Sequence, residues 1–470
     1  MEKVTNKETE KKENIAGEAK DQKEQQEINP ARLSAVKILS RYDRSDSYID
    51  KLLAHELKHK NFNPQDKALL TEIINGVIRW RSKLDWVLNG FYFGDYQKCL
   101  NIIKNSMRVG LYQMMMLDRI PPYAAINDAV EIVKNIQSEK TAGVVNGVLR
   151  NILRNINKIR YPDTAQDEVY HYAIIHSHPK WMVKRWMTDI GLDNTIKMME
   201  FNNKRPYVPL RINTELSSPE EIRELFRKHN VKFEETNYLP NSIKLESPNF
   251  DISETEIFKK GKVTVQDTSA SLAANLACPK EDNFVLDLCA APGGKSFYLA
   301  EQMHNTGRVV AVDKYFSKLK FIEEGAKRLR LDKIETLEAD AENIEFEEKP
   351  DIIFADVPCS GIGTLSKKPD IKWKRDLGDV REMAGHQKKI LANAVKLSKP
   401  GTVIVYSTCT TEPEENQDNV KWFLENYPEF ELDPAEKYLP KDLCKDGMMV
   451  VTPYEHNLDG AFAVRLVRKS

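Results

Sequence analysis

Two cysteines follow apolar segments that have the composition of buried strands. Cys359 lies three residues after the segment 352–356, and Cys409 lies three residues after the segment 403–406. Doubly wound folds bind ligands at the edge where their strands end, so both thiols are expected at a ligand-binding edge. A single cysteine there can be a simple core thiol, because buried cysteine is common. Two thiols at strand ends beside a ligand site favour a functional role over a coincidence of packing.

A further strand candidate, residues 284–288, runs into the glycine-rich segment Asp-Leu-Cys-Ala-Ala-Pro-Gly-Gly-Lys at 287–295. Its small residues allow a ligand to approach the backbone at the start of the following helix. The next strand candidate ends in Asp313, twenty residues after Gly293, where a carboxylate can accept hydrogen bonds from ribose hydroxyls. The pattern predicts an adenosine-containing cofactor without saying which one. Its spacing differs from the dinucleotide G-x-G-x-x-G, which weighs against NAD, and a plain tight turn is the alternative.

These segments belong to a region, 261–470, in which apolar strands alternate with amphipathic helices. Such alternation predicts a Rossmann-like α/β domain with a parallel, doubly wound sheet. A last strand or hairpin over 462–467 is expected at the edge of this sheet. Residues 161–260 combine an aromatic-basic helix with short strand candidates and predict a small α+β linker domain.

Apolar residues recur at helical spacing from 30 to 160, which predicts an all-α domain. This block has 21 Lys+Arg against 12 Asp+Glu, whereas the whole chain of 470 residues has a net charge of −1. The local positive excess suits the phosphates of a nucleic acid, although many soluble domains carry as much. Residues 1–29 are rich in charged residues and glutamine, with little apolar content, and predict a disordered charged tail.

The composition also argues against several classes of protein. The tail lacks the apolar core of a signal peptide and no segment is apolar enough to span a membrane, so we expect a cytoplasmic protein. The six cysteines form no CxxC pair, which argues against a zinc site, and no metal is expected. Without a secretion signal, the thiols are expected to be reduced.

Three motifs of the sheet domain resemble motifs I, IV and VI of RNA 5-methylcytosine methyltransferases. In chain order they are the glycine-rich segment 287–295, Asp-Val-Pro-Cys-Ser-Gly at 356–361 and Ser-Thr-Cys-Thr at 407–410. Gln-Asp-Thr-Ser at 266–269 and Asp-Gly-Ala-Phe at 459–462 resemble the entry and closing segments of the same family. The resemblance covers the last 210 residues and implies a class I methyltransferase domain that uses S-adenosylmethionine.

The helical block resembles the NusB-like RNA-binding domain, through Ile-Pro-Pro-Tyr-Ala-Ala-Ile-Asn-Asp at 120–128 and Val-Asn-Gly-Val-Leu-Arg at 145–150. A NusB-like domain joined to a Sun-type methyltransferase is similar to the architecture of the bacterial RsmB (Sun, Fmu) family. Members of that family methylate a cytosine of small-subunit (16S) ribosomal RNA, so the resemblance implies RNA as the partner. We expect the chain to act as a monomer.

The resemblance also assigns a role to each reacting group. Cytosine C5 is a poor nucleophile, and a thiolate that adds to C6 makes C5 enamine-like, so that C5 can attack a methyl sulfonium. Cys409 would be this nucleophile, and Cys359 would assist the elimination that releases the enzyme. Asp356 would hydrogen-bond or protonate N3 of the base, and Lys295 would help to order the site. The expected cofactor-contacting residues are Cys289, Ala290, Ala291, Pro292, Gly293, Gly294, Lys295, Asp313, Asp340 and Asp356.

The segment 367–375, just after Cys359, holds four lysines, an arginine and a tryptophan. It is expected to bind RNA phosphates and to stack on a base that has left its helix, and a solvated basic loop is the alternative. Val357 and Ala461 depart from the family pattern, which has alanine at the first position and commonly an aromatic residue at the second. Neither departure removes a reacting group, so substrate fit is in question rather than the reaction.

Of three other functions, the first remains open and the other two are disfavoured by the motifs. The same reaction could act on transfer RNA or on another ribosomal site, because the wider family shares the catalytic motifs. A non-catalytic RNA-binding assembly factor would have no need of both Cys359 and Cys409. An amine methyltransferase would carry an Asn/Asp-Pro-Pro-aromatic loop where this chain has Asp-Val-Pro-Cys.

Overall fold

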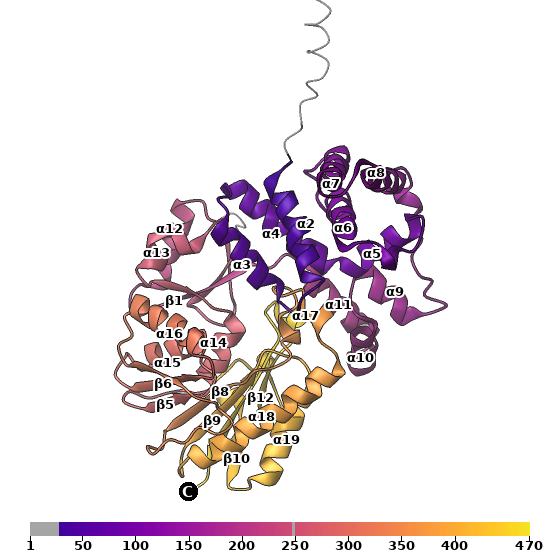
Figure 1. Cartoon of the computed structure of the whole chain (residues 1–470). Helices are drawn as coiled ribbons and strands as arrows, with labels where there is room; N and C mark the ends of the chain where they lie inside the picture. Colours follow the sequence, from indigo (N-terminus) through magenta and orange to yellow (C-terminus); the bar gives the residue numbers. More distant parts are fainter. Residues whose placement is uncertain (1–27, 247–249) are drawn as a thin grey trace, which may run out of the picture. The chain divides into compact units, whose positions relative to one another are not determined.

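The computed structural model describes residues 28–246 and 250–470 (Figure 1). The predicted disordered tail, 1–29, therefore lies almost wholly outside the described residues. The chain divides into two compact units. Within the described residues, the first comprises 28–77 and Val87–Ile159, and the second comprises Ile78–Trp86, 160–246 and 250–470.

The first unit is helical throughout its described part, as the spacing of apolar residues predicts. Asn29 caps the first helix by accepting a hydrogen bond from the backbone N–H of Arg32 at 3.1 Å. Pro122 begins α7, a position that proline favours. A Cβ at Gly110 would lie 2.9 Å from Leu149, so this glycine lets α6 and α8 approach closely. The helices are α2 (Pro30–Tyr42), α3 (Ile49–His59), α4 (Pro64–Arg79), α5 (Arg81–Phe91), α6 (Asn101–Met116), α7 (Pro122–Ile136) and α8 (Glu139–Arg154), of which α4 and α5 continue into the second unit.

A small antiparallel sheet with the strand order β2-β3-β1-β4 occupies the first part of the second unit. Ile222 and Phe226 of its covering helix α12 pack against Leu210, Ile212 and Ile243 of the strands, so the predicted α+β domain is confirmed. One edge strand, β4, comes from the chain just after residue 260. The elements are α9 (Glu168–Ile175), α10 (Lys180–Ile190), α11 (Leu192–Asn203), β1 (Val208–Ile212), α12 (Pro219–Lys228), β2 (Phe233–Glu235), β3 (Ser242–Leu245), α13 (Glu256–Lys259) and β4 (Val263–Val265).

A nine-stranded mixed sheet forms the centre of the second unit. Its strand order is β11-β12-β13-β9-β8-β5-β6-β7, with β10 pairing to β13. The run from β9 to β7 is parallel, as the alternation of strands and helices predicts, whereas β13 pairs antiparallel with β9. The strands are β5 (Phe284–Asp287), β6 (Arg308–Asp313), β7 (Ile334–Glu338), β8 (Ile352–Asp356), β9 (Val403–Thr408), β10 (Phe430–Asp433), β11 (Cys444–Lys445), β12 (Met448–Val451) and β13 (Ala461–Arg468).

The expectation that the last strand lies at the sheet edge is wrong. β13 lies inside the sheet, because β9 pairs with one of its sides and both β12 and β10 pair with the other. The first four residues of β13 are all buried, which is the pattern of a strand covered on both faces.

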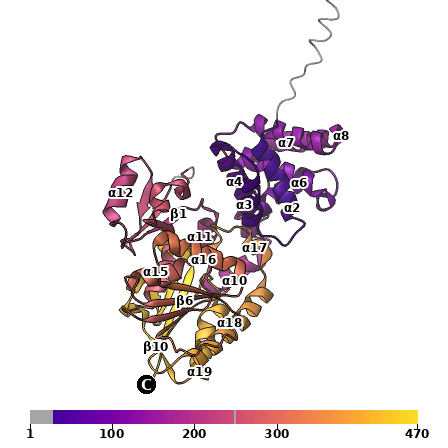
Figure 2. The same ribbon diagram turned by 60° about the vertical axis from the view of Figure 1, so that its left-hand side comes forward.

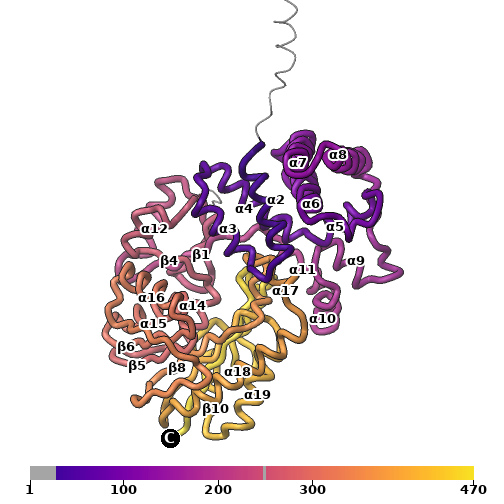
Figure 3. The backbone as a smooth tube through the Cα atoms, viewed as in Figure 1, coloured from indigo at the N-terminus to yellow at the C-terminus, as the bar shows by residue number. Residues whose placement is uncertain are grey.

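Helices cover both faces of the large sheet, and each face has its own core (Figures 1 and 2). Alternate residues of β8 belong to different cores. Phe354 packs in the core that includes α14, α15 and α16, whereas Ile353 packs in the core that includes α18 and α19. The tube in Figure 3 follows the chain through these layers. The helices are α14 (Thr268–Asn275), α15 (Gly294–Gln302), α16 (Phe316–Leu329), α17 (Ile371–Lys374), α18 (Leu377–Leu397), α19 (Gln417–Asn426) and α20 (Pro453–His456).

The loop after β8 and the turn before β13 are in contact through two glycines, Gly363 and Gly460. The backbone N–H of Gly460, just before β13, donates to the carbonyl of Gly363 at 2.9 Å. The N–H of Gly363 in turn donates to the carbonyl of Cys409 at 3.1 Å. A Cβ on Gly363 would lie 2.2 Å from the Gly460 carbonyl oxygen. The loop after β8 therefore requires glycine here.

We expect Gly363→Ala to lower the free energy of unfolding by about 1–3 kcal/mol, the usual effect of overpacking a tight contact. Gly385→Ala is the matched control, because a Cβ at this exposed position of α18 meets nothing within 4 Å. That control should stabilise the protein by about 0.4–1 kcal/mol, since alanine restricts the unfolded chain. Urea unfolding of both variants measures the difference. Equal midpoints would contradict the close contact.

Candidate active site

The carboxyl ends of the parallel strands bring four of the expected side chains to one edge. Asp356 ends β8, and it lies opposite Ser407 of β9 in the parallel register. Asp313 ends β6, and Asp287 ends β5 between β6 and β8. Cys409 directly follows β9, and Cys359 lies three residues after the end of β8. The shared edge expected from the strand ends is therefore present.

The two cysteines are in contact. Their Sγ atoms lie 3.2 Å apart, and the backbone N–H of Cys409 points at the Cys359 sulfur at 3.4 Å. The hydrogen bond from the Cys359 thiol lowers the pKa of Cys409, and the positive charges of Lys295 and Lys368 lower it further. The same hydrogen bond and burial raise the pKa of Cys359. Of the two thiols, Cys409 is therefore the one that ionises at the lower pH.

Asp356 and Lys295 form an ion pair beside the thiols. The Lys295 ammonium lies 2.5 Å from Asp356 Oδ2, and Ser407 donates its hydroxyl to Asp356 Oδ1 at 2.7 Å. Burial disfavours the charged lysine, but the Asp356 carboxylate outweighs it and raises the pKa of Lys295. Lys295 thus stays charged, so it both orients Asp356 and favours the Cys409 thiolate.

A buried polar network behind the two cysteines joins their loops. The hydroxyls of Ser360 and Thr410, the residues after each cysteine, lie 2.8 Å apart. Glu415 accepts the backbone N–H of Ser360 at 2.8 Å and an N–H of Gln387 at 2.9 Å. Burial raises the pKa of Glu415. Glu415 and Gln387 were not expected from the sequence, because a charged run between a strand and a helix has the composition of a solvated loop.

The glycine-rich segment begins α15, as expected. Gly293 has a φ of +106°, and a Cβ there would lie 2.4 Å from the ring of Phe297. Asp287 is buried, and its Oδ2 accepts a hydrogen bond from Ser296 at 2.6 Å. Its Oδ1 has no hydrogen-bond partner in the part of the chain that the structure describes. Burial raises the pKa of Asp287 to about 7. This buried acid, absent from the expected contacts, is suited to a ligand that donates a hydrogen bond.

The remaining expected cofactor residues lie near the ends of β5, β6 and β7. Asp313 Oδ1 accepts the backbone N–H of Tyr315 at 3.0 Å. Asp340 lies 2.8 Å from Lys314, and this hydrogen bond lowers the pKa of Asp340. The backbone N–H of residue 339 donates to the carbonyl of Asp313 at 3.2 Å, which holds these two strand ends together. Burial raises the pKa of Cys289, so this thiol remains protonated.

The basic segment 367–375 differs from the expected RNA-binding loop. Lys372 is 1% exposed, and its ammonium donates to the carbonyl of Arg79 at 2.9 Å. The indole N–H of Trp373 donates to the carbonyl of Ile78 at 2.7 Å. Lys367 is held in ion pairs. The expectation is wrong for Lys372, which is buried against the backbone of Arg79, whereas contact of the rest of the segment with RNA stays a prediction.

Among residues 28–246 and 250–470, the structure contains no group of three or more histidine, cysteine or acidic side chains that could hold a metal ion. No helix within the same ranges is long and apolar enough to cross a bilayer.

The pKa directions predict different reactivities for the two thiols. Iodoacetamide should label Cys409 at a lower pH than Cys359, because the lowered pKa gives Cys409 a larger thiolate fraction at each pH. Lys295→Met should move the Cys409 profile to higher pH by removing a positive charge. Peptide mass spectrometry across a pH series measures each rate, with the exposed Cys278 as internal reference. Coinciding profiles for Cys409 and Cys359 would contradict the assignment.

Comparisons with known proteins cover all three parts of the chain. A model described as 16S rRNA methyltransferase RsmB/F matches residues 274–467, and the NusB family model matches residues 29–154. A model of the ferredoxin-like domain of RsmF/B-like methyltransferases matches residues 178–253. The predicted three-part architecture and the family resemblance are therefore confirmed.

Individual relatives extend over nearly the whole chain. The probable ribosomal RNA small subunit methyltransferase B of Bacillus subtilis (strain 168) is 35% identical over 442 residues, which are 93% of this chain and 98% of the relative. The ribosomal RNA small subunit methyltransferase B of Cronobacter sakazakii (strain ATCC BAA-894) is 33% identical over 88% of this chain and 93% of its own length. The solved structure of a methyltransferase homolog protein from Pyrococcus horikoshii is 26% identical, with a TM-score of 0.56, and covers 65% of this chain and 99% of its own. The chain belongs to the ribosomal RNA small subunit methyltransferase B family.

Proposed function

We propose that this protein transfers a methyl group from S-adenosylmethionine to C5 of a cytosine in small-subunit (16S) ribosomal RNA. The observation that carries the proposal is the contact between Cys409 and Cys359 at the edge that also holds the Asp356–Lys295 pair. A thiolate, a thiol and an oriented carboxylate are the groups that methylation of this carbon requires. The names of the relatives supply the substrate class.

The reaction begins at Cys409. Its thiolate adds to C6 of the base, and the electron pair of the C5–C6 double bond moves onto C5. Asp356, once protonated, donates a hydrogen bond or its proton to N3 and so offsets the charge that develops on the ring, while Lys295 holds this side chain in place. S-adenosylmethionine supplies an electrophilic methyl group that C5 attacks. Loss of the C5 proton to water then restores the double bond and expels the Cys409 thiolate. Cys359, whose sulfur touches that of Cys409, assists this elimination by hydrogen-bonding the leaving thiolate.

The acidic strand ends fit S-adenosylmethionine. The free Oδ1 of buried Asp287 is suited to accept a hydrogen bond from the cationic amino group of the cofactor. Gly293 leaves the backbone open to close approach at the start of α15, and Asp313 is placed to accept hydrogen bonds from ribose hydroxyls. Asp340, which pairs with Lys314 in this structure, would contact the adenine. The residues that would line the cofactor are Cys289, Ala290, Ala291, Pro292, Gly293, Gly294, Lys295, Asp313, Asp340 and Asp356.

RNA is the proposed macromolecular partner, with the NusB-like helices contributing to its binding. The target base has to leave its stack to reach two thiols at a strand edge, so a single-stranded or locally opened site is expected. A monomeric state and a cytoplasmic location stay predictions. Transfer RNA, another ribosomal site, or a role as a non-catalytic assembly factor are the alternative outcomes of the test below.

The first test identifies the product. The full chain is incubated with labelled S-adenosylmethionine and unmodified small-subunit ribosomal RNA, and the nucleosides are separated. Labelled 5-methylcytidine at one site is the expected result. Label in transfer RNA alone would keep the reaction and overturn the substrate. Absence of label from every RNA would overturn the proposal and favour the assembly factor.

The second test separates the roles of the two thiols. Cys409→Ala should abolish methylation and leave no covalent complex, because the C6–S bond cannot form. Cys359→Ala should accumulate a protein–RNA adduct that resists denaturation, because elimination is impaired. Cys278→Ala is the matched control, since this cysteine is exposed and outside the site. Normal turnover by Cys409→Ala would overturn the nucleophile assignment.

A further inference from the structure

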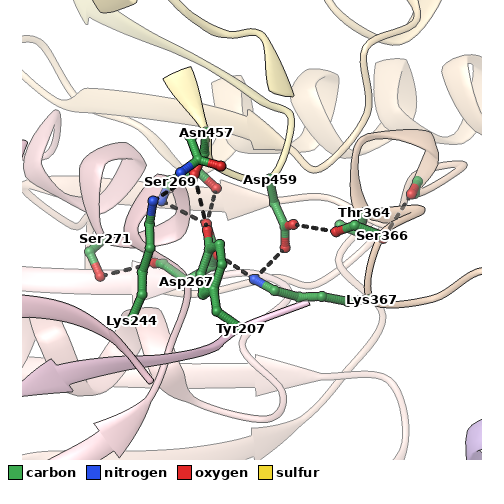
Figure 4. Close-up of polar contacts among 11 residues, drawn as sticks. Tyr207, Lys244, Asp267, Ser269, Ser271, Thr364, Ser366, Lys367, Asn457 and Asp459 are labelled. Atoms are coloured by element: carbon green, nitrogen blue, oxygen red, sulfur yellow. Dashed lines mark hydrogen bonds and ion pairs between the residues drawn. The ribbon is translucent and has the colours of Figure 1, made fainter. Parts of the chain in front are cut away.

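A largely buried cluster of three charged residues lies beside the loops that carry the reacting groups. The ammonium of Lys367 contacts the carboxylate of Asp267, and it lies 2.8 Å from Asp459 Oδ2 (Figure 4). Exposed fractions are 20% for Lys367, 12% for Asp267 and 7% for Asp459. The three residues come from the loop after β8, the start of α14 and the turn before β13. One cation therefore joins three segments that are far apart in the sequence.

The surroundings of this cluster leave Lys367 as its central positive charge. Lys367 also lies 4.7 Å from the ring centre of Tyr207, and Lys244 donates to the carbonyl of Asn457 at 2.8 Å rather than to either carboxylate. Asp267 additionally accepts the N–H and hydroxyl of Ser269, at 2.9 and 2.7 Å.

The two carboxylates differ in their titration. Burial alone would raise the pKa of Asp267, but the Lys367 ammonium lowers it overall. Burial and the charge of Asp267 raise the pKa of Asp459. Burial disfavours the charged lysine, yet the two carboxylates raise the pKa of Lys367. Without this cation, two buried acids would face each other unpaired, which is strongly unfavourable.

The segments that Lys367 joins are the ones that hold the thiols. Cys359 and Lys367 both lie in the loop between β8 and α17, and Gly363, between them in that loop, donates its N–H to the carbonyl of Cys409 at 3.1 Å. Gly460, the neighbour of Asp459, donates to the carbonyl of Gly363 at 2.9 Å. The ion pairs therefore anchor the two segments, around Gly363 and Gly460, whose backbone hydrogen bonds lead to Cys409.

The same cluster reaches the glycine-rich segment. Gln266, the neighbour of Asp267, packs against Gly294, where a Cβ would lie 3.6 Å from the Gln266 amide. Gln266 also accepts a hydrogen bond from the buried Arg211 at 2.6 Å. Gln266 thus contacts the glycine-rich segment, and its neighbour Asp267 contacts Lys367, which lies in the same loop as Cys359.

We propose that Lys367 is a positioning residue that sets the location of the Cys359–Cys409 pair through its ion pairs with Asp267 and Asp459. The inference rests on the proposed cytosine-C5 reaction. Lys367 contacts Asp267, Asp459 and the ring of Tyr207 rather than the reacting thiols, so its loss should slow the attack of Cys409 on C6 without weakening the binding of either substrate. Misplacing a reacting atom by about 1 Å can slow a reaction about 100-fold.

The test measures covalent addition directly. The full chain is mixed with S-adenosylmethionine and an RNA that carries 5-fluorocytosine, because fluorine at C5 blocks the final elimination and traps the adduct. Lys367→Met should form the adduct up to about 100-fold more slowly, with unchanged dissociation constants for S-adenosylmethionine and RNA. Lys367→Arg should restore most of the rate, because it keeps the charge between the carboxylates. Lys437→Met, which removes an exposed lysine paired with Asp433, is the matched control and should react as the wild type.

A double variant keeps the test decisive if Lys367→Met fails to fold. Lys367→Met with Asp459→Asn leaves a single buried carboxylate, so it should fold while still lacking the bridge, and it should remain slow. Adduct formation at the wild-type rate by either Met variant would overturn the inference, as would a loss confined to substrate affinity. If the wild type itself forms neither adduct nor 5-methylcytidine, the proposed function fails instead, so the two failures are distinguishable.

Discussion

Asp356 and Ser407 lie opposite each other on neighbouring parallel strands, and the two cysteines follow within three residues of this pair. The backbone ladder between β8 and β9 thereby determines where both thiols can be. A slip of the register by one residue would turn each side chain to the other face of the sheet. It would separate Asp356 from Ser407 and from Lys295. It would also shift the two cysteine-bearing loops relative to each other along the strand direction. The reacting groups depend on this ladder more than on any contact they make with one another.

Buried charges provide the second level of positioning. A buried ion is tolerated only with partners that satisfy its charge and its hydrogen bonds, so such pairs have few alternative geometries. Lys295 pairs with Asp356 inside the site, and Lys367 pairs with two carboxylates behind it. A lysine belonging to one segment thus binds acids of another in both cases. The pairing restricts how each loop can lie after its strand has ended.

The sequence was sufficient for those features that are local in the chain. The strand, glycine turn and helix around Gly293 are contiguous, and so are the cysteines and the strands that precede them. Glu415 and Gln387 could not be predicted, because their role depends on the packing of α18 beside the loops. A lysine in a basic segment is expected at the surface. The residue that accepts the hydrogen bond of Lys372 lies 293 residues earlier in the chain, so its burial could not be predicted locally.

The position of the last strand within the sheet also could not be predicted from the sequence. A short apolar run predicts burial but does not identify the strands that will flank it. The sequence 461–466 is apolar at all but one position, Arg465, and this pattern fits an interior strand as well as an edge. Only the pairing of β13 with β9 on one side and with β12 on the other decides between them.

The interior place of β13 has a consequence for biosynthesis. The five parallel strands leave the ribosome before β13 does, so for a time β9 has an open side with unpaired N–H and C=O groups. An open strand of this kind readily recruits strands from other chains. A nascent chain that stalls before residue 461 would present such a strand directly beside two adjacent thiols. Aborted translation products of this protein should therefore be prone to aggregate and to cross-link, and should depend on chaperones more than the finished chain does.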